Sequence, residues 1–149
     1  ERENIALVLD SSPSCQRMAK LYSKMAFLSA KLGCLDIYLA PNAFVTHKYN
    51  IRTGEYDVIF DKDDDKNSIV LGLDKLHNFF KNRVVLFFGD WDGERYILPA
   101  SNHNELHWFH SEFSYDEDDW STSVLKDYHG AIYGCSTRED LISVIKTIR

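Results

Sequence analysis

The chain has 149 residues, of which 44% are hydrophobic and 27% are charged, so it is long enough to bury one core and is not of the disordered class. Its formal net charge of −6 argues against nonspecific nucleic-acid binding, because such binding needs a basic surface that displaces counterions. No apolar stretch approaches the roughly 20 residues of a membrane span, and the three cysteines are widely spaced, as in reduced proteins. We therefore expect a cytoplasmic domain without a membrane or nucleic-acid partner, and its start at Glu1 leads us to expect that it is part of a larger protein.

The first forty residues predict a strand, a helix and a second strand. Ile5–Leu9 is an uninterrupted apolar run, which is typical of a strand buried on both faces. Residues 14–32 carry apolar side chains every three or four positions, which predicts an amphipathic helix that ends at Gly33. Residues 35–40 form the second predicted strand. Such a crossover is right-handed and produces parallel sheet.

The middle of the chain predicts a hairpin. Residues 43–51 and 55–60 flank the turn residues 52–54, so one antiparallel strand is expected at the edge of the parallel sheet. Residues 71–82 predict a second helix. The five apolar residues from Val84 to Phe88 predict the most deeply buried strand.

The last third predicts a short helix at residues 103–113, a strand at residues 131–135 and a final helix. A capping-box pattern, from Ser136 to Glu139, opens that helix. Residues 1–149 are therefore expected to form one α/β domain. Its three layers would be doubly wound around a mostly parallel central sheet with one antiparallel edge strand.

Oxygen-bearing side chains follow two of the predicted strands. Asp10, Ser12 and Ser14 come directly after the first strand, and Asp90 follows the strand that ends at Phe88. The carboxyl ends of parallel strands meet at one edge of a sheet, where ligands of open α/β sheets bind. Carboxylate and hydroxyl oxygens are hard donors that suit Mg²⁺. The same residue types also cap helices, so Asp10 or Ser12 alone is weak evidence for a metal.

This arrangement resembles the von Willebrand factor type A domain with a metal-ion-dependent adhesion site. That family begins with an apolar strand that runs into Asp-x-Ser-x-Ser, which matches Asp10, Ser12 and Ser14 in full. The element order is similar over essentially the whole chain. The resemblance therefore implies a Rossmann-like fold of the von Willebrand factor type A class.

Two further positions complete the resemblance. The family commonly has Gly-x-Thr before the second helix, where this chain has Asn67-Ser68, so Ser68 would supply that hydroxyl. The later strand-end carboxylate corresponds to Asp90, which directly follows the strand and its glycine. Asp92 is the competing alignment, because it keeps the Asp-Gly pair of the family.

The resemblance implies a protein-binding module and not an enzyme. The hydroxyls would contact Mg²⁺ directly, with Mn²⁺ or Ca²⁺ as alternative ions, and the Asp side chains would act directly or through water. A Glu or Asp carboxylate of a partner protein would fill the open coordination position. Trp91 and Asp92, beside the site, are expected to contact that partner. The metal ligands implied are Asp10, Ser12, Ser14, Ser68 and Asp90.

An enzyme is the alternative interpretation. An apolar strand that ends in Asp90-x-Asp92-Gly93 is similar to the start of haloacid dehalogenase phosphatases. In that family the first Asp is the nucleophile, the second is a general acid and Mg²⁺ is bound. However, Glu94 stands where Thr is usual, the motif lies in mid-chain, and Asp10 would be left without a role.

A third possibility is a member of the family whose metal site has decayed, which would leave a plain protein-interaction scaffold. A zinc site is a separate alternative. His103, His107 and His110 have helical spacing, so a helix at residues 103–113 would bring at least two of them to one side. The order of residues is not the His-Glu-x-x-His of metalloproteases. Surface or partner-facing histidines are the more ordinary interpretation.

Overall fold

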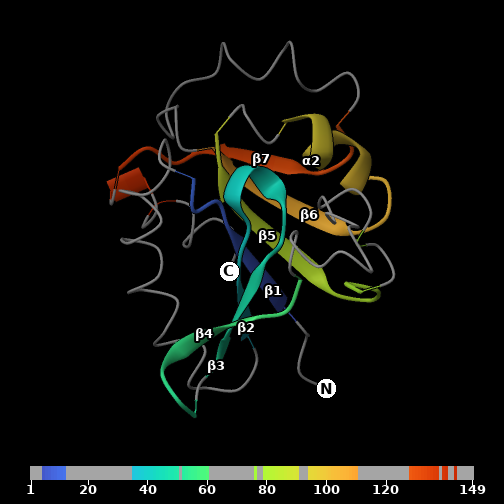
Figure 1. Ribbon diagram of the computed structural model, residues 1–149. Coiled ribbons are helices and arrows are strands. Elements are labelled where there is room, and N and C mark those ends of the chain that lie inside the picture. Colours follow the sequence, from blue (N-terminus) through green and yellow to red (C-terminus); the bar gives the residue numbers. More distant parts are fainter. Residues whose placement is uncertain are drawn as a thin grey trace.

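The described part of the computed structural model forms one seven-stranded sheet (Figure 1). The structure describes residues 5–12, 35–50, 52–60, 76, 79–90, 94–110, 128–137, 139–140 and 143. The strands are β1 (Ile5–Leu9), β2 (Leu35–Leu39), β3 (His47–Asn50), β4 (Glu55–Val58), β5 (Val84–Gly89), β6 (Glu105–His110) and β7 (Ala131–Gly134). The described helices with printed bounds are the 3₁₀ turn η1 (Pro41–Ala43) and α2 (Glu94–Ala100). The helices predicted at residues 14–32 and, for the most part, 71–82 lie outside the described residues.

The sheet is mostly parallel, as predicted. Its strand order is β4-β3-β2-β1-β5-β6-β7, and β1 pairs in parallel with both β2 and β5. β5, β6 and β7 continue the parallel pairing. β1 therefore lies in the middle of the sheet (Figure 1). The strands β2 to β4 lie on one side of β1, and the later strands β5 to β7 lie on its other side.

The predicted hairpin is confirmed, but the edge of the sheet differs from the expectation. β3 pairs antiparallel with β2, and β4 pairs antiparallel with β3, so the hairpin adds two strands instead of one. The reversed strand β3 is second from the edge and β4 is outermost. Register explains this difference, because β3 has partners on both sides: Lys48 lies opposite Tyr38 of β2 and opposite Asp57 of β4.

The helix predicted at residues 103–113 is wrong in its described part. Residues 105–110 form β6, and the helix is upstream, as α2. Leu106 and Trp108 are buried on one face of the sheet and Phe109 on the other, so the segment is a central strand with apolar contacts on both sides. A short mixed run of this kind is ambiguous between helix and strand in the sequence, and the tertiary contacts decide.

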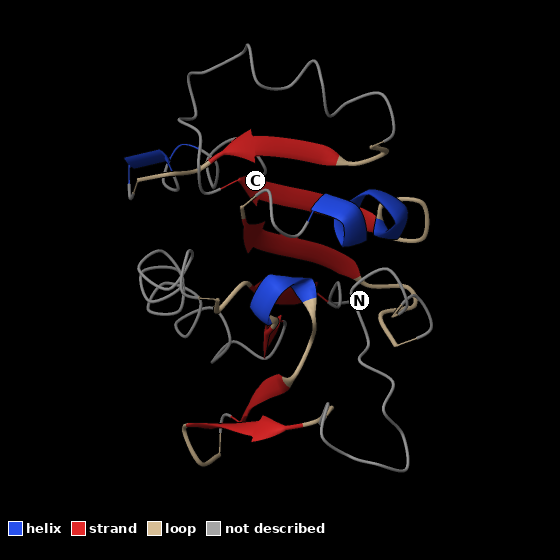
Figure 2. Ribbon diagram, turned by 45° about the horizontal axis from the view of Figure 1, so that its top comes forward, coloured by secondary structure: helices blue, strands red, loops and turns tan. Residues whose placement is uncertain are grey.

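Both faces of the sheet bury apolar side chains. On one face, Val8, Phe87 and Trp108 pack with Ile97 of α2, which lies against that face (Figure 2). On the other face, Leu9 and Phe109 belong to a second buried cluster. No helix in the described part of the chain is long and apolar enough to cross a membrane.

The final helix opens one residue later than the capping-box pattern suggested. The backbone N–H of Asp140 donates to the Thr137 hydroxyl at 3.1 Å, and the Asp140 carboxylate accepts from the backbone N–H of Thr137 at 3.2 Å. This reciprocal pair is the capping box, formed by Thr137 and Asp140 in place of Ser136 and Glu139. Ser136 also donates to Asp140 through its own N–H and hydroxyl.

Gly89 is required by close approach at the end of β5. A Cβ atom there would lie 2.5 Å from the Phe87 ring and 3.1 Å from the Asp10 Cβ atom. We expect Gly89→Ala to lower the free energy of unfolding by about 2–3 kcal/mol, because overpacking in a core forces its neighbours to move.

Gly54→Ala is the matched control for this substitution. Gly54 has a φ of 75° but no atom within 4 Å of its added Cβ, so only the backbone penalty of about 1 kcal/mol applies. Urea unfolding of both variants measures the difference. Equal losses of stability would contradict the packing constraint at Gly89.

Candidate functional site

The ends of β1 and β5 place two aspartates side by side at the carboxyl edge of the sheet. Leu9 is in register with Phe88, and the backbone N–H of Asp10 donates to the Phe88 carbonyl at 2.9 Å. Asp10 and Asp90 therefore follow two neighbouring strands. The chain continues from β1 to β2 on one side, whereas β5 lies on the other side of β1, so the strand order reverses between β1 and β5. This is the position at which open α/β sheets bind ligands.

The Asp10 carboxylate is buried and has its two oxygens in different surroundings. Its side chain is 1% exposed. Oδ1 accepts hydrogen bonds from the Ser12 N–H at 2.9 Å, the Ser12 hydroxyl at 2.6 Å and the Asn42 N–H at 3.2 Å. Oδ2 is also buried, and it has no hydrogen-bond partner in the described part of the chain. A buried carboxylate oxygen in this condition needs a donor or a cation.

The loop after β2 contributes a backbone group that the sequence analysis did not identify. The Ala40 N–H donates to the Leu9 carbonyl at 2.8 Å, which holds the start of this loop against β1. Asn42 then has a φ of 53°, a left-handed conformation that Asn tolerates better than most residues. Its N–H points at Asp10 as a result. The Pro41-Asn42 pair signals a turn, but not the residue that the turn would contact.

Burial and charge both act on the pKa of Asp10. Burial raises this pKa above its ordinary value, the hydrogen bonds from Ser12 and Asn42 oppose the rise, and the nearby charge of Asp90 adds to it. Asp90 is itself only 3% exposed. Two buried acidic groups thus interact unfavourably when both are ionised, and a cation between them would remove this repulsion.

A buried histidine stands next to this pair. His110 ends β6, lies in register with Gly89 and is 0% exposed. Its ring stacks on Trp108 at 4.7 Å between centroids, and the Trp108 Nε1–H donates to the Gly89 carbonyl at 3.2 Å. Burial lowers the pKa of His110 to about 4, although the charge of Asp90 acts in the opposite direction. The imidazole is therefore neutral at neutral pH. Sequence spacing pointed to His110 only as a zinc ligand.

The zinc alternative is not supported by the described residues. His107 and His110 are an odd number of residues apart on a strand, so they face opposite sides of the sheet, and His103 is in the exposed turn after α2. Among the described residues, no group of three or more His, Cys, Asp or Glu side chains is arranged to hold a metal ion. A metal at Asp10 and Asp90 would thus need hydroxyl ligands as well.

Ser12 is the one predicted hydroxyl ligand within the described residues. It is 4% exposed, and its hydroxyl donates its proton to Asp10, so this hydrogen bond does not use the lone pairs of the hydroxyl oxygen. The other predicted site residues lie outside the described residues, namely Ser14, Ser68, Trp91 and Asp92.

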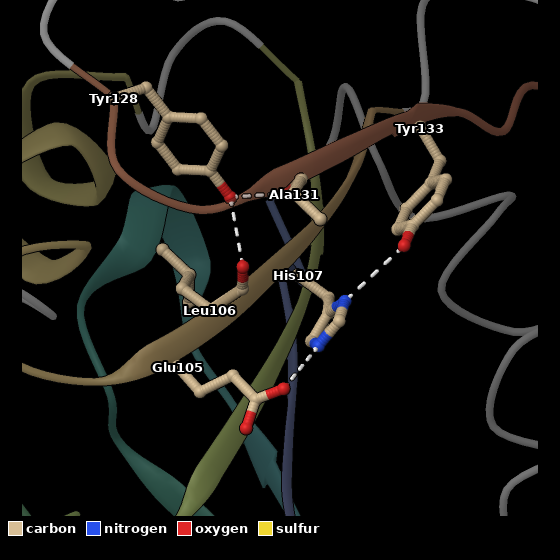
Figure 3. Close-up of polar contacts among 6 residues, drawn as sticks. All are labelled: Glu105, Leu106, His107, Tyr128, Ala131 and Tyr133. Carbon is tan, nitrogen blue, oxygen red and sulfur yellow. Dashed lines mark hydrogen bonds and ion pairs between the residues drawn. The ribbon is translucent and has the colours of Figure 1, made fainter. Parts of the chain in front are cut away.

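A second polar cluster, on β6 and β7, is structural (Figure 3). His107 Nε2 is 3.2 Å from the Glu105 carboxylate, and His107 Nδ1 is 3.4 Å from the Tyr133 hydroxyl. The Tyr128 hydroxyl donates to the Ala131 carbonyl at 2.5 Å, and the Leu106 carbonyl oxygen lies 3.3 Å from the same hydroxyl. Burial raises the pKa of Tyr128, so this hydroxyl stays protonated and fastens the start of β7 to β6.

Comparison of the chain with protein-family models, with curated proteins and with solved structures gave no match. The fold brings Asp10 and Asp90 together from positions far apart in the sequence.

Burial of His110 predicts a loss of stability in acid. The unfolded chain takes up a proton near pH 6.5, whereas folded His110 does so only near pH 4, so stability falls as the pH drops through this interval. The difference between the pKa values of the unfolded and folded chain corresponds to about 3 kcal/mol of unfolding free energy. Urea unfolding between pH 7 and pH 4 measures it, with His110→Gln as the reference. Profiles of equal slope for the two proteins would contradict this assignment.

Proposed function

We propose that this chain is a protein-interaction module that depends on a divalent cation, with the three-layer, doubly wound fold of von Willebrand factor type A domains. The cation, Mg²⁺ or in its place Mn²⁺ or Ca²⁺, would bind between the ends of β1 and β5. The observation that carries this proposal is the burial of Asp10 and Asp90 side by side, with Asp10 Oδ2 lacking a hydrogen-bond partner among the described residues.

The donor set is chemically suited to such an ion. Asp10, Asp90 and Ser12 offer hard oxygens at one edge of the sheet, and Mg²⁺ prefers oxygen ligands and retains waters. Ser14 and Ser68 are proposed as the remaining hydroxyl ligands. The hydrogen bonds from Ser12 and Asn42 to Oδ1 fix the carboxylate of Asp10 and leave Oδ2 for the cation.

The partner is proposed to be a protein that offers a Glu or Asp carboxylate. Mg²⁺ demands near-octahedral oxygen coordination, so a carboxylate oxygen of the partner can fill a position that the ligands of this chain leave open. Trp91 and Asp92 follow Asp90 directly in the sequence and are proposed to contact the partner. The chain would act by binding and not by catalysis.

A phosphatase that uses Asp90 and Asp92 is the alternative function. It would explain a cation beside Asp90, but it gives no role to the hydrogen bonds that orient Asp10. Incubation of the chain with a generic aryl phosphate and Mg²⁺ separates the two functions. We expect no turnover above that of Asp90→Asn. Turnover that is lost in this variant would replace the interaction module with the enzyme.

Asp10→Asn tests the metal site with little change in shape. The amide keeps an oxygen for the Ser12 and Asn42 donors but removes the negative charge. Calorimetric titration with Mg²⁺ should show binding to the wild-type chain and at least about tenfold weaker binding to the variant, since loss of a charged ligand costs more than 1.4 kcal/mol. Null curves for both proteins would refute the site.

The same variant should be the more stable protein without metal. The folded-state pKa of Asp10 is raised, so ionisation is harder in the folded than in the unfolded chain, and the charge lowers stability as the pH rises through that interval. Asp10→Asn should therefore unfold at a higher urea concentration than wild type at pH 7 in EDTA. A less stable variant would show that Asp10 has a structural role, such as a cap, instead.

A further inference from the structure

β4 presents an exposed edge at the outer side of the sheet, far in strand order from the candidate metal site (Figure 1). Within the described residues it pairs only with β3. Glu55, Asp57 and Val58 are exposed, and Val58 reaches 60%, which is a large value for an apolar residue on a strand. The outer edge of a sheet is a template for the addition of another strand.

The register shows which backbone groups face outward. The Ile59 N–H donates to the Thr46 carbonyl at 2.9 Å, so this pair is at a hydrogen-bonded position of the ladder. Hydrogen-bonded and non-hydrogen-bonded pairs alternate along antiparallel strands. Asp57 therefore turns its backbone groups toward β3, and the N–H and C=O of Val58, which lies opposite His47, point away from β3.

The side chains of β4 give this edge a charge. Glu55 and Asp57 lie on one face of the strand, since they are two residues apart. The Asp57 carboxylate accepts a hydrogen bond from the neutral Asn50 amide at 3.0 Å. Lys48 is opposite Asp57 in register, but its ammonium lies 3.9 Å from Asp36. Among the described residues, no cation forms an ion pair with Glu55 or Asp57.

A second copy of this chain fits the edge poorly. Antiparallel pairing of β4 with itself would bring Glu55 and Asp57 of both copies onto one face, and like charges on neighbouring strands are destabilising. A segment with cations at alternate positions meets the same two carboxylates favourably. The formal net charge of −6 would also attract such a segment.

We propose that the β4 edge binds an extended segment of a partner protein in which lysine or arginine alternates with apolar residues. The segment adds to the sheet as a further strand. The backbone of Val58 provides hydrogen bonds, Glu55 and Asp57 select the basic side chains, and the exposed Val58 side chain contacts the apolar ones. This surface is independent of the proposed metal site.

The probe is a short capped peptide that alternates lysine and valine, with a glutamate-valine peptide as its control. Binding is followed by fluorescence anisotropy in EDTA, and amide shifts in NMR spectra locate it. We expect the lysine peptide to bind and to shift the amides of β4, and the glutamate peptide not to bind. Shifts confined to other strands would overturn the proposal, as would equal binding of both peptides.

Two variants separate backbone pairing from charge. Val58→Pro removes an N–H that faces away from β3, a position at which edge strands accept proline, and should weaken binding of the lysine peptide about tenfold.

The variant that combines Glu55→Lys with Asp57→Lys should reverse the preference in favour of the glutamate peptide. It remains informative if the proline variant does not fold. Unchanged affinities in a folded variant would overturn the proposal. Concentration-dependent dimers that exclude the peptide would assign the edge to a second copy instead.

Discussion

Burial of two carboxylates at the ends of neighbouring strands is the constraint around which the carboxyl edge of this sheet is built. Asp10 and Asp90 end neighbouring parallel strands, and both are almost fully shielded from water. Burial, with a smaller contribution from the charge of Asp90, raises the pKa of Asp10, so the ionised Asp10 carboxylate lowers the stability of the folded chain. Groups that lower stability and yet lie in a ligand-binding position of the fold are candidates for function.

The surroundings of the pair fix its geometry from three strands. The loop after β2 supplies the Asn42 N–H to Asp10, and the segment after β1 supplies Ser12. From the other side, Trp108 of β6 holds the Gly89 carbonyl next to Asp90. Gly89 itself allows β5 to approach Asp10, because a side chain there would collide with the Phe87 ring and crowd the Asp10 Cβ atom. A cation would thus meet ligands that are already oriented, which is the usual role of such outer contacts.

The sequence predicts those parts of the fold and of the candidate site whose pattern lies within a short stretch of the chain. The apolar runs of β1 and β5 and the strand-end aspartates were found because buried parallel strands and their polar ends are visible in the sequence. Strand β6 was missed because its histidine spacing imitates a helix, and its burial on both faces depends on its neighbours. The contact of Asn42 with Asp10 spans 32 positions and depends on strand order, and the place of His110 beside Gly89 depends on register.

Paramagnetic broadening by Mn²⁺ is the sharpest test of a cation site between the ends of β1 and β5, because it reports where an ion binds and not only that it binds. Under this account, substoichiometric Mn²⁺ broadens the NMR signals of Ser12, Asp90 and His110 first, and excess Mg²⁺ restores them. The signals of Tyr49 and Glu55 in the hairpin stay sharp. Broadening confined to the acidic run at residues 61–65, with the signals of Ser12 and Asp90 unchanged, would contradict the account.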